Sequence, residues 1–143
     1  MSFLFTPHPR GRVISAPQWP LLAQSGLSPI DYLTSSEIEK VLGKTYFPTI
    51  DYSLLSNCEV VSIAVPTPVD EKDQPDLRML NSVASEAIKY LPTGSMIIIE
   101  STINVGTTRK DILPLIKSSG KEIDLVYSPE RIDPGNAKYN VVN

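Results

Sequence analysis

The stretch Ser95–Thr102, SMIIIEST, decides the fold. Its four consecutive apolar residues, Met96–Ile99, are typical of a strand that is buried on both faces of a parallel sheet. The polar residues Glu100, Ser101 and Thr102 follow directly, where the strand should end. Because ligands bind outside the carboxyl ends of parallel strands, this stretch predicts both a central strand and a candidate site.

Apolar runs on either side of this stretch predict two more buried strands. The run EVVSIAVP, residues 59–66, is β-branched and closes at Pro66, and IDLVYSPE, residues 123–130, passes from apolar residues into a turn. Between the strands, residues 76–92 repeat apolar residues at helical spacing behind Asp76, and residues 106–120 indicate a second helix that Pro114 should kink. This alternation predicts βαβ units and a parallel sheet covered on both faces.

The remainder of the chain divides at about residue 27. Thr34 or Ser35 can cap a short helix that stops at Gly43, and a turn of helix is expected near residues 51–57. Residues 1–30 contain five prolines, so residues 1–27 are expected to be an irregular, Pro-rich segment. We therefore expect two parts, the segment 1–27 and one α/β domain over residues 28–143.

Composition excludes several kinds of partner. No apolar run approaches the roughly 20 residues of a membrane helix. All 16 acidic residues and 11 of the 13 basic ones follow residue 30, so nucleic acid is an unsuitable partner for this acidic body. A single cysteine, Cys58, precludes an internal disulfide and a cysteine-based metal site, which fits a cytoplasmic location. No metal site is expected, and Cys58 reads as a small half-buried apolar residue.

Three polar clusters lie where predicted strands end. Pro66-Thr67-Pro68 lacks two backbone donors, which leaves the Thr67 amide and hydroxyl to bind a ligand. Such a loop can also be an ordinary turn that only ends the strand. The EST cluster at 100–102 supplies a carboxylate and two hydroxyls. Glu130 and Arg131 in VYSPERIDPGN add a potential base and a fork for phosphate or carboxylate, unless they are solvated loop residues.

In this order, VPTP, ESTINVGTT and YSPERIDPGN resemble the nucleotide-sugar 6-dehydrogenase family, which comprises UDP-glucose, GDP-mannose and UDP-N-acetylhexosamine dehydrogenases. The resemblance covers roughly residues 26–143, and SPERIDPGN looks most like the UDP-N-acetylamino sugar branch. It implies an NAD-dependent oxidoreductase that converts the C6 alcohol of a UDP-sugar to a carboxylate, with a role in polysaccharide biosynthesis.

The same resemblance implies roles for individual residues. Pro66 and Thr67 would lie against the NAD dinucleotide, and Ser101 and Thr102 near the nicotinamide and its ribose. Thr102 and Glu130 would be catalytic, positioning water to hydrolyse a thioester. Glu130 and Arg131 would also contact the nucleotide sugar.

The sequence also departs from the family pattern. The family opens with a strand and a Gly-x-Gly-x-x-Gly turn that cradles the pyrophosphate, and neither is recognisable here. The expected fold is therefore an incomplete Rossmann-type doubly wound parallel sheet lacking its first two strands. The function implied is that of a fragment of such a dehydrogenase, inactive alone. The alternative is a non-catalytic Rossmann-like module that binds a partner or a nucleotide sugar without turnover, and a methyltransferase is a weaker one.

The missing first strand predicts an unpaired sheet edge. In the doubly wound order the strand near Val60–Val65 would have the first strand as its inner neighbour. Without it, unpaired amides and carbonyls would invite another chain, so marginal stability and self-association are expected. RVIS, residues 12–15, is the one N-terminal run that could cover this edge.

Overall fold

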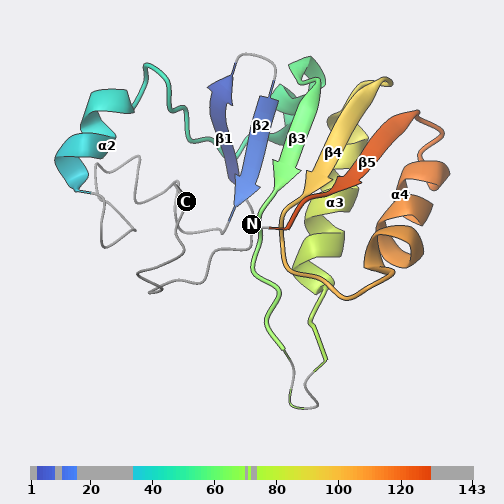
Figure 1. The fold of residues 1–143 in the computed structure, drawn as a ribbon. Helices are drawn as coiled ribbons and strands as arrows, with labels where there is room; N and C mark the ends of the chain where they lie inside the picture. Colours follow the sequence, from blue (N-terminus) through green and yellow to red (C-terminus); the bar gives the residue numbers. More distant parts are fainter. Residues whose placement is uncertain (1–2, 9–10, 16–33, 70, 72–73, 130–143) are drawn as a thin grey trace.

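The structure, a computed structural model, describes residues 3–8, 11–15, 34–69, 71 and 74–129. They form one five-stranded sheet with helices between the strands (Figure 1). In chain order the elements are β1 (Phe3–His8), β2 (Gly11–Ser15), α2 (Ser35–Val41), the 3₁₀ helix η1 (Tyr52–Asn57), β3 (Val60–Ile63), α3 (Arg78–Tyr90), β4 (Ser95–Ile99), the π-helical turn η2 (Thr108–Ile112), α4 (Leu113–Ser118) and β5 (Ile123–Tyr127).

The sheet has the spatial order β1-β2-β3-β4-β5. Strands β2 to β5 pair in parallel, and β1 pairs antiparallel with β2. In register, Val61 lies beside Ile97, and Ile97 beside Leu125. This parallel arrangement confirms the Rossmann-type fold class.

The N-terminal segment corrects the expectation that residues 1–27 are irregular. Phe3–His8 and Gly11–Ser15 form β1 and β2, and β2 pairs with β3 from Gly11↔Val60 to Ile14↔Ile63. The β3 edge is therefore covered, so the predicted route to self-association through that edge is closed. Pro7 is compatible with β1 because β1 is an edge strand, where a missing N–H costs no ladder bond on its open side. The division at residue 27 stays a prediction.

The helices begin and end where their sequences indicate. Thr34 caps α2 in a reciprocal arrangement in which the Thr34 N–H donates to Glu37, and Gly43 adopts φ 73° after the helix. The Arg78 amide donates to Asp76 Oδ1 over 3.0 Å at the start of α3. Pro114 has no N–H for the Lys110 carbonyl, and the helix there opens as the π turn η2 before becoming α4.

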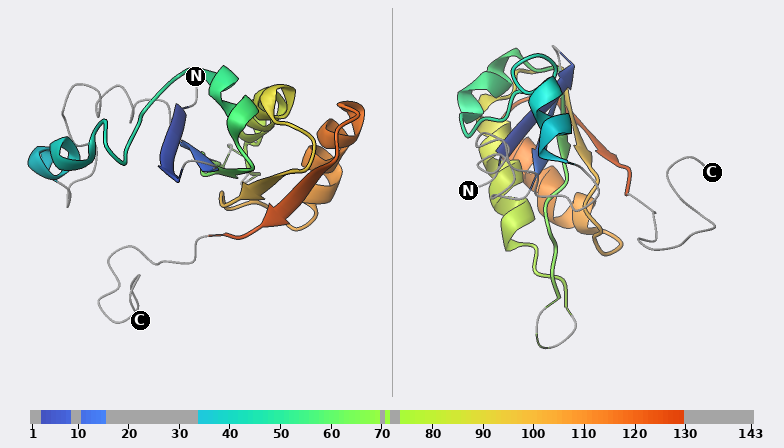
Figure 2. Two further views of the ribbon diagram at one scale, coloured as in Figure 1. Left: turned by 90° about the horizontal axis from the view of Figure 1, so that it is seen from above. Right: turned by 90° about the vertical axis from the view of Figure 1, so that its left-hand side faces the viewer.

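The core lies between the sheet and helices α3 and α4. Side chains that alternate along β3 and β4 point into it, with Val61, Ile63, Ile97 and Ile99 fully buried. The helices close it with apolar residues, chiefly Leu80, Val83, Ala84, Ala87, Ile88, Ile112 and Ile116. Figure 2 shows α3 and η1 stacked on one side of the sheet.

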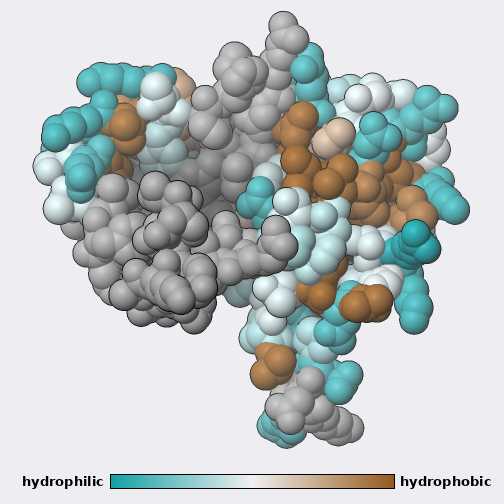
Figure 3. Space-filling model, in the orientation of Figure 1, coloured by the Kyte–Doolittle hydropathy of each residue, from teal (hydrophilic) through white to brown (hydrophobic). Residues whose placement is uncertain are grey.

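The opposite face of the sheet is apolar as well. Met96 and Ile98 are half-buried there, and Val126 is 37% exposed. Figure 3 shows this hydrophobic surface over the strands β3 to β5. No described helix packs on this face. The sequence predicted helices on both faces of the sheet, and within the described ranges they cover one face. No helix among those residues is long and apolar enough to cross a bilayer.

Candidate functional site at the carboxyl ends of the parallel strands

The carboxyl ends of β2 to β5 lie together at the lower edge of the sheet in Figure 1. Residues 64–69, directly after β3, leave the sheet at this edge, and residues 100–102, directly after β4, lie next to them. Ser128, directly after β5, donates its N–H to the Ile99 carbonyl over 3.0 Å. The strands β3, β4 and β5, which precede the three predicted polar clusters, thus end beside one another.

Ser101 connects the first two loops from within the protein. Only 6% of its surface is exposed. Its Oγ accepts a hydrogen bond from the Val65 N–H over 2.9 Å and donates to the Val65 carbonyl over 2.7 Å. The Ser101 hydroxyl is therefore engaged with the backbone of the loop after β3.

A second link joins the same loops nearer the surface. The Thr67 hydroxyl donates to the Thr102 carbonyl oxygen over 2.6 Å. Thr102 is exposed, and its own amide and hydroxyl have no hydrogen-bond partner in the described part of the chain. The Thr67 amide likewise has none there, and its neighbours Pro66 and Pro68 have no N–H at all. These three groups form a small set of free donors at the surface of the site.

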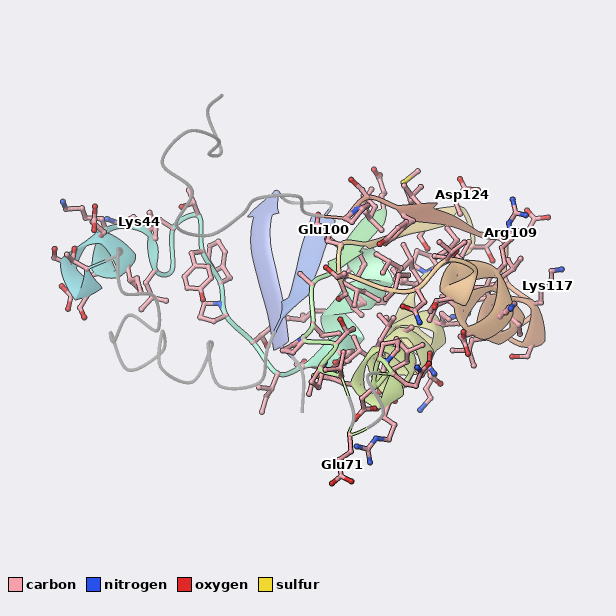
Figure 4. The ribbon with its side chains drawn as sticks, turned by 60° about the horizontal axis from the view of Figure 1, so that its bottom comes forward. Lys44, Glu71, Glu100, Arg109, Lys117 and Asp124 are labelled. Atoms are coloured by element: carbon pink, nitrogen blue, oxygen red, sulfur yellow. The ribbon has the colours of Figure 1, made fainter. Side chains whose placement is uncertain are left out.

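Glu100 contributes the carboxylate of the EST cluster. Its amide donates to the Ile63 carbonyl over 2.9 Å, which holds its backbone beside the end of β3, and its side chain is half-buried. Figure 4 shows Glu100 at the end of β4, away from Arg109 and Lys117 on the helical side and from Glu71 at the tip of the long loop.

Cys58, the only cysteine in the sequence, lies at the other end of β3. It is 1% exposed, and its Sγ lies 3.5 Å from the Leu54 carbonyl, to which it donates. It belongs to the apolar core, so it is a packing residue and not a thiol that faces the candidate site.

A separate hollow lies between the C-terminal parts of α3 and α4. It is lined by Ser85, Ile88, Lys89, Leu115, Ser118, Ser119 and Lys121. The Lys121 ammonium is engaged there, because it donates to the carbonyls of Ile88, Lys89 and Leu91 over 2.7 to 2.8 Å. Among the described residues no group of three or more His, Cys, Asp and Glu could hold a metal ion.

The structure brings together three of the four residues expected to cluster, namely Thr67, Ser101 and Thr102. Glu130 and Arg131 lie outside the described residues. Two further residues of the site were not identified from the sequence. The backbone of Val65 pairs with the Ser101 hydroxyl, and the Tyr127 Oη accepts from the Ile103 N–H over 3.5 Å. Val65 acts through its backbone, which carries no residue-type signal, and Tyr127 lies in a strand whose aromatic residue has no motif of its own.

Comparison with known proteins identifies relatives of this arrangement. Residues 24–143 match the model of the UDP-glucose/GDP-mannose dehydrogenase family, NAD binding domain. UDP-N-acetyl-D-glucosamine 6-dehydrogenase of Pseudomonas aeruginosa is 39% identical over 98 residues, which cover 65% of this chain and 23% of the relative. UDP-N-acetyl-D-mannosamine dehydrogenase of Methanococcus aeolicus is 42% identical over 81 residues, covering 54% and 18%.

Solved structures give the same relationship. A UDP-D-ManNAc dehydrogenase from Pyrococcus horikoshii superposes with a TM-score of 0.71 at 29% identity, covering 86% of this chain and 31% of the other. GDP-mannose dehydrogenase from Pseudomonas aeruginosa gives 0.72 at 22% identity, covering 82% and 30%, which shows the shared fold. The chain thus spans about a quarter or less of the length of the curated relatives given above. It belongs to the UDP-glucose/GDP-mannose dehydrogenase family and corresponds to part of that family's NAD-binding domain.

Proposed function

We propose that this chain serves the NAD-dependent oxidation of the C6 alcohol of a UDP-sugar to a carboxylate, with a UDP-N-acetylamino sugar as substrate. NAD, the cofactor of this domain family, supplies the hydride acceptor. The observation that carries the proposal is the set of free donors at the carboxyl ends of the strands, the amides of Thr67 and Thr102 and the Thr102 hydroxyl. The printed names of the relatives support the class of substrate.

These donors fit a dinucleotide. The carboxyl ends of parallel strands in a doubly wound sheet are the usual place for one. Pro66 and Pro68 stiffen the loop and hold the Thr67 N–H as its one backbone donor within residues 66–68. An exposed amide and hydroxyl at Thr102 can donate to the oxygens of a ribose or an amide group.

Roles within the reaction follow from position. Thr67 and Pro66 would line the dinucleotide, and Thr102 would lie near the nicotinamide end. Glu130, with Thr102, would orient a water molecule toward an acyl carbon, since a carboxylate can accept the proton that the attacking water releases. Arg131 would pair with an anionic group of the nucleotide sugar.

The thiol for an acyl intermediate would have to come from outside these 143 residues. Cys58 is the only cysteine, and it is buried at the opposite end of β3. We therefore propose that this chain alone does not complete the oxidation. Because it has no recognisable Gly-x-Gly-x-x-Gly turn for the pyrophosphate, we also propose that it binds NAD⁺ weakly. It would act in the cytoplasm, where NAD⁺ and UDP-sugars are available.

Calorimetry on the purified chain with NAD⁺ and a panel of UDP-sugars tests this function. Binding of NAD⁺, together with binding of a UDP-N-acetylamino sugar in preference to GDP-mannose, is the expected outcome. Binding of a nucleotide sugar without any heat from NAD⁺ would instead favour a non-catalytic sugar-binding module. No binding of either ligand would contradict the proposal.

A further inference from the structure

We infer that Ser101 is a positioning residue, whose hydroxyl fixes the spacing between the loops that carry Thr67 and Thr102 and makes no contact with the cofactor. The inference rests on the proposed function, because it assigns a task to a residue of the same site. It also changes the role that the family resemblance implied for Ser101, from a cofactor contact to a support behind the contacts.

The Ser101 hydroxyl has no free donor for a ligand. A serine hydroxyl carries one proton and two lone pairs. The proton is directed to the Val65 carbonyl at 2.7 Å, and one lone pair accepts from the Val65 N–H at 2.9 Å. The residue is 6% exposed. A ligand could therefore accept the Ser101 proton only by displacing the bond to the Val65 carbonyl.

These bonds extend the sheet past the end of its ladder. Strands β3 and β4 pair as far as Ile63 and Ile99, and the amides of Glu100 and Ser101 both then donate to the Ile63 carbonyl, over 2.9 and 3.3 Å. Val65 is 4% exposed, so its backbone groups need partners inside the protein. The Ser101 hydroxyl pairs with both the N–H and the carbonyl of Val65. In a longer ladder, the backbone of a neighbouring strand would provide these two partners.

The consequence appears two residues after Val65 on one loop and one residue after Ser101 on the other. Pro66 and Pro68 cannot donate, so a regular ladder cannot continue beyond Val65. The next link is the bond from the Thr67 hydroxyl to the Thr102 carbonyl, and the free amides of Thr67 and Thr102 lie on either side of it. Ser101 is thus the buried support that sets how far apart these two donors stand.

Ser95 provides a matched control on the same strand. It is 1% exposed, and its Oγ donates to the Pro92 carbonyl over 2.7 Å at the amino end of β4. Ser95→Ala removes a buried hydroxyl just as Ser101→Ala does, but far from the site along the strand. Ser101→Cys keeps a weak donor of similar size, and it serves if Ser101→Ala does not fold.

The experiment combines amide hydrogen exchange with an NMR titration of the chain by NAD⁺. In Ser101→Ala the Val65 amide should exchange roughly tenfold faster or more, the expected effect of a lost buried hydrogen bond. NAD⁺ should bind roughly tenfold more weakly, since misplaced donors forfeit a preorganised contact. Ser101→Cys should fall between Ser101→Ala and the wild type, and Ser95→Ala should match the wild type in both measurements.

Two results would overturn the inference. Equal NAD⁺ affinity in Ser101→Ala and Ser95→Ala would mean that Ser101 only adds stability. Weaker binding in Ser101→Ala with unchanged Val65 exchange would mean that the hydroxyl contacts the cofactor directly. If the wild type does not bind NAD⁺, the proposed function fails, and the support role is judged on the amide shifts of Thr67 and Thr102. They must move in Ser101→Ala and not in Ser95→Ala.

Discussion

The Thr67 hydroxyl donates a hydrogen bond to the Thr102 carbonyl over 2.6 Å, across 35 positions of sequence. Thr67 follows β3 and Thr102 follows β4, so the bond joins the carboxyl ends of two neighbouring parallel strands. This bond lies at the surface. Along both loops it follows the buried contact between Ser101 and Val65. The two loops of the candidate site therefore act as one unit.

Removal of the Thr67 hydroxyl should separate the two loops at the surface. Thr67→Val keeps the shape of the side chain but loses the donor, and we expect a loss of about 0.5–1.5 kcal/mol in the free energy of unfolding and weaker NAD⁺ binding. Thr67→Ser should preserve both. Chemical denaturation and calorimetry measure the two effects. Thr93→Val, an exposed threonine beside the amino end of β4, is the control, and an equal loss of affinity there would exclude a local role for Thr67.

Replacement of Lys121 should destabilise the C-terminal end of α3. Its ammonium donates to three carbonyls there, those of Ile88, Lys89 and Leu91, which the helix itself leaves without partners. Lys121→Met keeps most of the apolar stem, and it should cost about 1–2 kcal/mol of unfolding free energy. Thermal melts of Lys121→Met beside Lys117→Met, which alters an exposed lysine of α4, would reveal the difference. Equal melting temperatures would contradict the capping role.

A proline in β2 should expose the edge of β3. Val13 pairs with Phe5 on one side and Ser62 on the other, so β2 has a neighbour on both sides. Val13→Pro removes a backbone donor from this interior strand, and the ladder bond lost should cost about 1–3 kcal/mol. We expect aggregation on size-exclusion chromatography, because unpaired strand edges recruit other chains. Val13→Thr, which keeps the N–H, should stay monodisperse. A monodisperse, cooperatively melting Val13→Pro variant would show that β2 does not protect the sheet.

Acid should weaken the start of α3. Hydrogen bonding from the Arg78 side chain lowers the pKa of Asp76 from its ordinary value of 3.8 to about 2. Because the folded pKa is the lower one, the stabilisation by Asp76 is complete above about pH 4 and is lost as the pH falls through about 2. An NMR titration of the Asp76 carboxyl should show this low pKa, and Arg78→Met should return it toward 3.8. A pKa near 3.8 in the wild type would exclude the interaction in solution.

The sequence predicted the elements after residue 34 well because each has a strong local signal. The apolar run before Glu100 could only be a buried strand, and the helical spacing behind Asp76 yielded α3. Residues 3–15 were misjudged because their strands depend on distant partners. Gly11–Ser15 is held by β3, whose first residue lies 49 positions beyond Gly11, and Pro7 is accommodated because β1 is an edge strand.

The candidate site was predictable in place but not in detail. Strand ends in a parallel sheet meet, so Thr67 and Thr102 could be grouped from their positions alone. The directions of the Thr67 and Ser101 hydroxyls could not, since they depend on backbone groups 35 and 36 residues away. Ser101 and Thr102 are adjacent and chemically alike, yet one is 6% exposed and bound to Val65 and the other faces solvent.

The measurement that tests the central claim most directly is a ¹H–¹⁵N NMR titration of the chain with NAD⁺. We expect the amide resonances of Thr67 and Thr102 to shift in a saturable way, with those of Ser118 and Lys121 at the hollow between α3 and α4 unchanged. Shifts confined to that hollow, or no shifts anywhere at millimolar NAD⁺, would contradict a dinucleotide site at the carboxyl ends of the strands.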